Sequence, residues 1–332
     1  MKGKQRDRLL YGPVYIIAIL IYISACILQP RFLTWGNNVN LFTRIAPLLL
    51  AGIAQMFVLL TGGIDLSIGA IIGITNVIAA SMPFVDSPLN VVLWMTVPVI
   101  IGTLIGLSNG FIIAHWGFPP FIVTLATGTI WTGVTLFIMD VPGGDISMDI
   151  YRGVTGKLFN AVPIPLLIII VAIVITRFIL KDTVFGRSVY AIGGNKEIAK
   201  ESGIPAKKIE IMVYGVSGLY AGLAGMFLSA MMVSADPLVG EPYVMNSIAV
   251  AVIGGVALTG GKGGVTGILG AAYIFFLIDN ILNLLGVSTF YQYVAKGLVI
   301  IIALTITSLN SQETKKIKIG PVIKSWLRRG ER

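Results

Sequence analysis

Asp65 is the residue whose setting most suggests a chemical role, because it lies between two long apolar runs. It follows Gly62 and Gly63 in the stretch LTGGIDLSIG. An ionisable group at membrane depth is costly and often marks a proton or cation site. A carboxylate just before a helix can instead cap it, here by accepting backbone N–H bonds from Ser67 and Ile68. The spacing favours the cap and leaves the proton or cation site as the alternative.

Asp279 raises the same question in a later apolar run. Asp279 and Asn283 fall on one face of a helix, which is expected to turn toward protein rather than lipid. Polar and aromatic side chains in other apolar runs could line a route for a hydroxylated solute; these are Asn109, Thr124, Thr127, Trp131 and Asn246. The glycine break and Asp65 are expected near this route or its cytoplasmic gate.

The sequence contains no recognisable ATP, metal or cofactor site. Lys262 follows a glycine pair, but a phosphate-binding loop requires a glycine where this chain has Val256 and a hydroxyl residue where it has Gly263. One cysteine, Cys26, and one histidine, His115, do not form a metal cluster. No nucleophile and base pair indicates an enzyme. We therefore expect no cofactor, and any ATP hydrolysis would belong to a separate subunit.

The composition indicates a polytopic membrane protein. Hydrophobic residues make up 56% of the 332 residues, charged residues make up 12%, and the mean hydropathy is +0.90. Soluble domains carry about 25% charged residues. The net charge of +9 gathers at the ends of apolar runs, where basic residues mark cytoplasmic loops. The charge therefore predicts topology, and no nucleic acid partner is expected.

Ten apolar segments approach the length of about 20 residues with which a helix crosses a bilayer. The sequence therefore predicts an all-α fold of about ten transmembrane helices in a single domain over residues 1–309, followed by a basic cytoplasmic tail at 310–332. The predicted spans are Tyr11–Leu28, Leu41–Thr61, Leu66–Ser81, Val91–Ile113, Phe121–Met139, Val162–Leu180, Ile211–Met232, Met245–Leu258, Val265–Leu285 and Tyr293–Ile306.

The basic residues predict the orientation of these spans. They gather before the first span, between the sixth and the seventh (Lys181–Lys208), and after the tenth (Lys315–Arg332). Six spans separate the first group from the second and four separate the second from the third, so all three can lie on the cytoplasmic side. Both termini are therefore expected in the cytoplasm.

The cytoplasmic loop at 181–210 should contain one short helix. Asn195 is a good N-cap, Lys196–Ser202 forms the helix, and Gly203 with Pro205 ends it. Such a loop is either a solvated connector or a docking element for a partner protein, and the spacing alone favours neither.

Glycines carry two further patterns. Small residues at helical spacing predict close helix contacts in the fourth and seventh spans; they include Gly102, Gly106, Gly110, Gly218 and Gly222. The stretch LTGGIDLSIG at 60–69 also matches LTGGKGGVTG at 258–267. Both stretches fall between two spans on the same predicted side, which suggests a possible internal repeat.

Five stretches resemble the permease subunits of ABC importers for ribose and other simple sugars; they are GGIDLSIGAI, PPFIVTLATGTI, FGRSVYAIGGNKEIAKESGI, IAVAVIGGVALTGGKGGVTGILGA and NLLGVSTFYQYVAKGLVIIIAL. The resemblance covers nearly the whole chain. It implies a multi-pass permease in the lipid of the bacterial plasma (inner) membrane, paired with a second copy or a paralogue. The other partners that it implies are two cytoplasmic ATP-binding cassette ATPase subunits and an extracytoplasmic solute-binding protein.

The resemblance also implies that the short cytoplasmic helix is a coupling helix. ATPase contact would then fall on Gly194, Asn195, Glu197, Ala199 and Gly203. The solute would be a sugar or a related small polar molecule. Its identity stays open, because this chain reads VMNSIA at 244–249 where many relatives carry ELDAIA.

The sequence therefore leaves two classes of function open. The first is an importer permease that forms a translocation path with a second permease subunit and is driven by ATP hydrolysis on separate subunits. The alternative is a proton-coupled secondary transporter in which Asp65 and Asp279 are the coupling residues. The alternative predicts uptake by this chain alone under a pH gradient.

Overall fold

The computed structural model describes residues 2–28, 30–82, 88–159 and 162–288, together with 290–292, 294–295, 297–298 and 301. Within these residues the chain is almost entirely helical, with one pair of two-residue strands. In chain order the elements are α1 (Lys2–Leu28), η1 (Pro30–Leu33), α2 (Trp35–Leu60), α3 (Ile68–Ser81), α4 (Pro88–Trp116), α5 (Pro120–Ile138), α6 (Met148–Thr155), β1 (Lys157–Leu158), β2 (Val162–Pro163), α7 (Ile164–Asp182), α8 (Val184–Gly194), α9 (Lys196–Glu201), α10 (Ala206–Met232), α11 (Glu241–Ile253) and α12 (Val265–Leu284).

Nine of the ten predicted spans coincide with apolar helices. Among the described residues, six helices are long and apolar enough to cross a membrane, namely α2, α4, α5, α7, α10 and α12. Shorter apolar helices correspond to part of α1, to α3 and to α11. The tenth predicted span, Tyr293–Ile306, lies largely outside the described residues, and the tail at 310–332 lies wholly outside them. The count of ten therefore stays a prediction.

Several helices begin or end away from the bounds of the predicted spans, and two of these differences have a clear local reason. α11 ends at Ile253, before the predicted Leu258, because Gly254 and Gly255 turn the chain, and Gly255 has a φ of +85° that favours glycine. α10 begins at Ala206 rather than at Ile211. Its first turns are charged, so this helix continues past the apolar span into the loop at 181–210.

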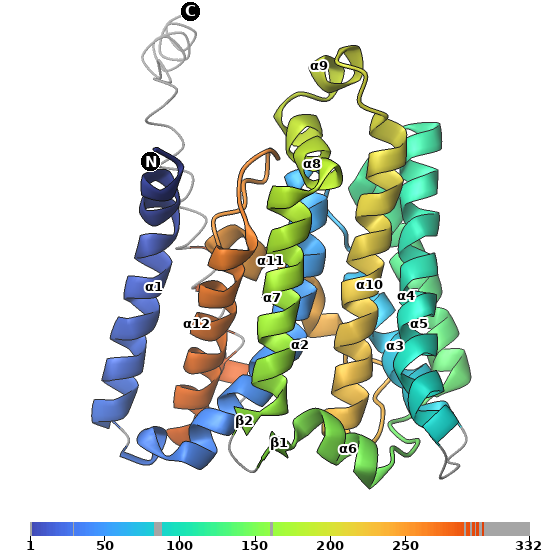
Figure 1. Cartoon of the computed structure of the whole chain (residues 1–332). Helices are drawn as coiled ribbons and strands as arrows, with labels where there is room; N and C mark the ends of the chain where they lie inside the picture. The colour runs from blue at the N-terminus through green and yellow to red at the C-terminus, as the bar shows by residue number, and fades with distance from the viewer. Residues whose placement is uncertain are drawn as a thin grey trace, which may run out of the picture.

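The helices form one bundle with α2 and α10 near its centre (Figure 1). α10 packs along α4, α2 and α3, while α1 packs against α12 at one edge. Helices α8 and α9 lie at one end of the bundle, and α6 with the β1–β2 pair lies at the opposite end. α1 begins toward the α9 end, as the predicted common side of the N-terminus and the loop at 181–210 requires.

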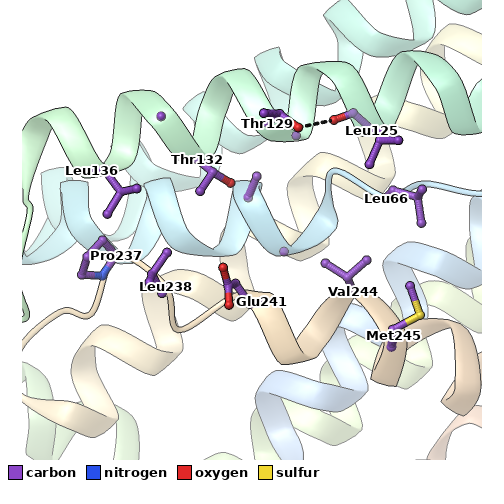
Figure 2. A pocket seen from close by; sticks show the side chains of 14 residues that line it. Leu66, Leu125, Thr129, Thr132, Leu136, Pro237, Leu238, Glu241, Val244 and Met245 are labelled. Carbon is purple, nitrogen blue, oxygen red and sulfur yellow. Dashed lines mark hydrogen bonds between the residues drawn. The ribbon is translucent and has the colours of Figure 1, made fainter.

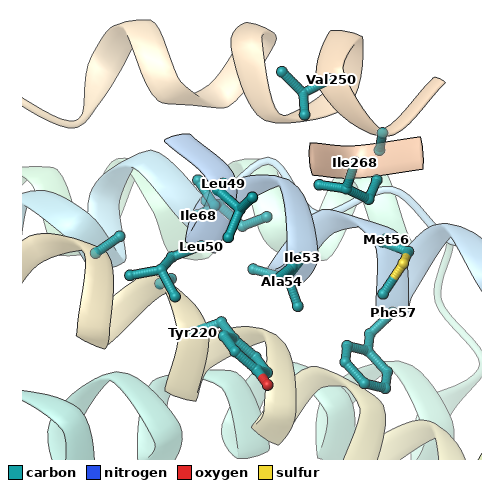
Figure 3. Packing of buried hydrophobic residues seen from close by; sticks show 14 of the residues in the cluster. Leu49, Leu50, Ile53, Ala54, Met56, Phe57, Ile68, Tyr220, Val250 and Ile268 are labelled. Carbon is teal, nitrogen blue, oxygen red and sulfur yellow. The ribbon is translucent and has the colours of Figure 1, made fainter. Parts of the chain in front are cut away.

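The core of the bundle is built around α2. Every side chain of α2 from Ile45 to Leu60 is buried, as expected for a helix that is apolar all round. Figure 3 shows Leu49 of α2 among partners from other helices, with Val250 of α11 on one side and Tyr220 of α10 on the other. By contrast, α5 and α7 expose large apolar side chains along much of their length, which suits lipid or another apolar surface.

The predicted glycine packing is confirmed between α4 and α10. A Cβ atom added to Gly102 would meet the Cα of Gly222 at 3.0 Å, and one added to Gly218 would meet the Cα of Gly106 at 3.1 Å. A Cβ atom on Gly106 would also overlap the carbonyl oxygen of Tyr214. The two backbones therefore approach closely because side chains are absent at the crossing.

Candidate functional site

The short helix predicted in the cytoplasmic loop is α9, and its ends have the predicted chemistry. The side chain of Asn195 accepts hydrogen bonds from the backbone N–H groups of Glu197 and Ile198, each at 3.0 Å. Gly203 ends the helix with a φ of +81°, and the N–H of Ile204 reaches back to the carbonyl of Ala199 at 3.0 Å. The sequence did not predict α8, the helix that precedes α9 in the same loop.

Side chains of α9 divide into an exposed set and an anchoring set. Glu197, Gly194 and Gly203 are exposed, and so is Ile198, an apolar residue that the sequence did not single out. Ala199 is only 4% exposed and packs into the protein's own core. Ala199 therefore holds α9 in place, and the outward surface is formed by its neighbours. Lys196 forms an ion pair with Glu210, which joins α9 to the first turns of α10.

Asp65 lies in the break between α2 and α3 and is fully buried. Its Oδ1 accepts hydrogen bonds from the backbone N–H of Ser67 at 2.9 Å and from the Ser67 hydroxyl at 2.6 Å. Its Oδ2 accepts one from the hydroxyl of Ser217, on α10, at 3.0 Å. The predicted bond from Ser67 is confirmed. The predicted bond from Ile68 is wrong, and Asp65 is not the N-cap of α3, because the helix begins at Ile68 and the residue at the N-cap position is Ser67, which makes no side-chain cap bond.

Two further predicted residues extend this buried network. The side-chain amide of Asn109, on α4, donates to the Ser67 hydroxyl oxygen at 2.9 Å. The hydroxyl of Thr124, on α5, accepts from the backbone N–H of Leu66 at 3.0 Å. Asp65, Asn109 and Thr124 are thus brought together at the break, where they join α3, α4, α5 and α10. Their bonds indicate a structural link rather than the lining of an open route.

The two glycine stretches meet beside the loop at 181–210. The N–H of Gly261 donates to the carbonyl of Leu60 at 2.9 Å, and a Cβ atom on Gly260 would lie 3.0 Å from the nitrogen of Gly62. Gly193 of α8 packs against both, because a Cβ atom there would overlap the carbonyl of Leu60. The stretches at 60–69 and 258–267 therefore lie on the same side, as predicted, and both touch the loop that carries α9.

A first cavity of about 500 Å³ lies between α3, α5 and the start of α11. Figure 2 shows Thr132 of α5 and Glu241 of α11 on opposite sides of it. The residues that line it are mostly apolar; they are Leu66, Gly69, Ala70, Leu125, Gly128, Thr129, Thr132, Gly133, Leu136, Pro237, Leu238, Glu241, Val244 and Met245.

The predicted path residues Thr127, Trp131 and Asn246 do not line this cavity. The cavity instead receives Thr129 and Thr132, which share a helical face with Leu125 and Leu136. That periodicity is present in the sequence and could have identified this face of α5. The hydroxyl of Thr127 bonds to its own helix at the carbonyl of Val123, at 3.0 Å.

A second cavity of about 550 Å³ lies between the start of α2 and the end of α12. Asp279 and Asn283 both line it, so their predicted common face is confirmed. They do not share a cavity with Asp65, which is buried in its own hydrogen-bond network. Arg44 of α2 also lines this cavity, although nothing in the sequence singled it out.

The chain matches known permeases over most of its length. Residues 37–304 match the family model described as branched-chain amino acid transport system, permease component. The ribose import permease protein RbsC of Haemophilus influenzae is 36% identical over 318 residues, which cover 94% of this chain and 97% of that protein. This chain belongs to that permease family. The permease is therefore a multi-pass protein of the bacterial inner membrane and a component of a transporter rather than an enzyme.

Other relatives agree with this assignment. RbsC of Bacillus subtilis is 40% identical over 294 residues, which cover 88% of this permease and 90% of that protein. The D-allose transport system permease protein AlsC of Escherichia coli is 34% identical over 309 residues, covering 91% and 92%. No solved structure matches the permease. The predicted resemblance to permeases of simple-sugar ABC importers is confirmed, and these relatives do not favour a proton-coupled transporter.

Proposed function

We propose that this permease is the transmembrane subunit of an ABC importer for a simple sugar. In this proposal it works with a second permease subunit, two ATPase subunits and an extracytoplasmic solute-binding protein. The main support is that relatives over most of the chain are named for ribose and allose. The sequence between Val256 and Gly263 lacks the residues of a phosphate-binding loop, so ATP hydrolysis is assigned to a partner.

The ATPase contact is assigned to the exposed side of α9. Glu197 offers a charge, Ile198 offers an apolar anchor that is 59% exposed, and Gly194 and Gly203 allow close approach of a partner backbone. Contacts of this kind, with an apolar anchor beside polar groups, carry much of the affinity of protein interfaces. Asn195 and Ala199 have supporting roles, since one caps α9 and the other packs it against the core.

Two physical connections can transmit movement of α9 to the rest of the permease. The ion pair between Lys196 and Glu210 joins α9 to α10, and Ser217, farther along α10, holds Asp65 at the break. The backbone contact between Gly193 and the two glycine stretches joins α8 to the same break. We therefore place the cytoplasmic gate at Gly62, Gly63 and the loop around Gly260.

The translocation path is assigned to the face of α5 and to the space between two permease subunits. Thr132 presents its hydroxyl group to the first cavity, with Glu241 of α11 on the opposite side, and Thr129 also lines the cavity while its hydroxyl donates to the carbonyl of Leu125 at 3.0 Å. Thr127, Trp131 and Asn246 are half-buried next to this region and stay candidates for the path once a second subunit is present. A neutral solute with many hydroxyl groups requires such polar groups more than fixed charges.

The test is recovery of an ATPase subunit with the tagged permease from its native membrane in mild detergent. The eluate is examined by mass spectrometry and assayed for ATP hydrolysis. For the double variant Glu197→Lys with Gly203→Val, recovery of the ATPase should fall at least about fivefold, as the loss of about 1 kcal/mol or more at a contact surface implies.

The matched control is Asp149→Lys, the same charge change on α6 at the opposite end of the bundle. It should retain the ATPase. Recovery of a single chain without ATPase activity, which nevertheless transports in liposomes under a pH gradient, would overturn the proposal. Retention of the ATPase by the double variant would contradict the assignment of the ATPase contact to α9.

A further inference from the structure

The second cavity differs from the first because its lining is mostly polar. From α2 it receives Asn37, Asn40, Leu41 and Arg44; from α12 it receives Phe276, Asp279, Asn280, Asn283 and Leu284; and Gln292 completes the lining. The start of α2 and the end of α12 lie at the end of the bundle opposite α9 (Figure 1). With the predicted orientation, this cavity belongs to the extracytoplasmic side.

The polar groups come from two opposed helix faces. Asn37, Asn40 and Arg44 share one face of α2, because they are spaced by three and four residues. Asn280 and Asn283 lie on the facing side of α12. The amide of Asn280 donates to the side-chain oxygen of Asn37 at 3.1 Å, which fixes the two faces relative to one another.

Several of these groups retain unused hydrogen-bonding capacity within the described part of the chain. The Oδ1 of Asn280 is buried and accepts no hydrogen bond there. No hydrogen bond or ion pair to Arg44 or Asn40 is found among the described residues, and both side chains are exposed to the cavity. A guanidinium offers five N–H donors, and an amide offers both donors and an acceptor. The cavity can therefore donate and accept at once.

The charges indicate what kind of ligand would fit. Arg44 and Asp279 are the charged residues in the described lining, so the formal charges of the described lining residues sum to zero. A phosphate group would meet the carboxylate of Asp279, and a cation would meet the guanidinium of Arg44. A hydroxyl group both donates and accepts, and it suits the mixed lining. Phe276, Leu41 and Leu284 provide apolar surface for the carbon side of a ring.

The position of Arg44 argues against a purely structural role. It lies about 13 Å along α2 from Trp35, at a rise of about 1.5 Å per residue, directly before the stretch Ile45–Leu60, which is buried throughout, in a helix long and apolar enough to span a membrane. Ionisable side chains in such helices are costly and commonly face a functional cavity.

We propose that the cavity between α2 and α12 is a receiving site for an uncharged sugar-like molecule on the extracytoplasmic side. Arg44, Asn40 and Asn280 are its hydrogen-bonding groups, and Phe276 is its apolar wall. The role of the site in import rests on the proposed function, whereas binding by the permease itself does not.

The experiment measures sugar binding by the full-length permease in lipid nanodiscs, using saturation-transfer NMR with D-ribose, D-allose and L-arabinose as separate probes. We expect a signal from at least one sugar. The signal should fall at least about threefold in Asn40→Leu and in Arg44→Met, a loss within the range expected for a hydrogen bond to a ligand. Asn40 makes no bond in the described fold, so its replacement should leave the melting temperature unchanged.

The control variant is Arg177→Met, which removes an exposed arginine on α7 outside the cavity. It should bind as the wild type does. Nanodiscs of phosphatidylcholine are compared with nanodiscs that also contain phosphatidylglycerol, because loss of sugar binding with the anionic lipid would show that a lipid headgroup occupies the site.

Four outcomes would overturn the inference, namely that lipid result, the absence of any sugar signal, an unchanged signal in Asn40→Leu and Arg44→Met, and an equal loss of signal in Arg177→Met. The proposed importer function is tested separately by sugar uptake in the assembled complex. Uptake by the wild type without any binding to the isolated permease would reject this site and leave the proposed function standing.

Discussion

At the scale of single residues, the hydrogen bonds of a buried carboxylate show whether the group has a structural role. Each oxygen of Asp65 has at least one donor, and the donors come from two different segments of the chain. A carboxylate satisfied in this way links helices, because removing it would leave several buried donors without a partner. As a structural link, Asp65 should tolerate replacement by a residue that keeps these hydrogen bonds.

Asp65→Asn should retain at least about half of the uptake of the assembled importer. Its side-chain oxygen can still accept from Ser67, and its amide can donate to the hydroxyl of Ser217, since a hydroxyl also accepts. Asp65→Leu should lower the melting temperature and the yield, because each buried donor left unpaired costs about 1–3 kcal/mol. The measurement is radiolabelled sugar uptake per inserted permease, with thermal melting of each variant in detergent.

Normal insertion and stability of Asp65→Asn together with complete loss of transport would contradict this account. The carboxylate would then be needed for its charge. Uptake by the assembled importer that is unchanged when a pH gradient is imposed would agree with the structural role.

The sequence predicted the residues of the break better than those of the cavities. A charge next to a glycine pair is visible in the sequence, so Asp65 and its bond to Ser67 could be predicted. The bond from Ser217 could not be predicted, because Ser217 is far along the chain and nothing in the sequence pairs it with Asp65. Thr129 and Arg44 were missed for a different reason, since their importance depends on which helix faces are opposed.

At the scale of elements, the close crossing of α4 and α10 depends on the absence of side chains. Gly106 faces the backbone of Tyr214, and Gly218 faces Gly106. The backbone cannot give way as the end of a flexible side chain can. Addition of one methyl group there must push the two helices apart.

Gly106→Ala should therefore destabilise the permease by about 1–3 kcal/mol, the usual range for overpacking. The matched control is Gly153→Ala on α6, where an added Cβ atom meets nothing within 4 Å. Alanine favours a helix over glycine, so the control should be neutral or slightly stabilising. The measurement is thermal melting of both variants in the same detergent. Equal melting temperatures for the two variants would show that α4 and α10 are less closely packed than the glycine contacts indicate.

Helix existence was predicted well, whereas helix ends and loop structure were not. Apolar runs identify α2 or α7 because the bilayer requires their length and composition. α8 and the β1–β2 pair lie in polar loops, where no long run of apolar residues marks an element. The early end of α11 follows from Gly254 and Gly255. A count of apolar residues does not detect this end, because the residues around the two glycines are apolar.

At the scale of the whole molecule, topology follows from charge, and it can be measured with the single cysteine of the chain. Cys26 is replaced by alanine, and one new cysteine is then introduced in Ser202→Cys, beside α9, or in Asp149→Cys, on α6. Both sites are exposed. A maleimide that does not cross membranes should label the Asp149 site in intact spheroplasts and the Ser202 site only after permeabilisation.

The opposite labelling pattern would invert the predicted orientation and would place α9 away from any cytoplasmic ATPase. The permease is expressed alone for this test, so that a partner does not cover Ser202. The assembly with a second permease, and the tenth span, are also properties of the whole molecule. They depend on surfaces and residues that lie beyond the described chain, so they stay predictions.

The contact of Gly193 with the two glycine stretches is made by main-chain atoms, and this has a consequence for how such a permease could acquire a new cargo. Main-chain atoms are chemically the same at every position, so this junction carries no information about the solute. Under the proposed roles, a change of cargo requires new side chains in the cavities and leaves the junction unaltered. Coupling to ATP hydrolysis and choice of solute would then be separate properties of one chain, and each could be re-engineered without rebuilding the other.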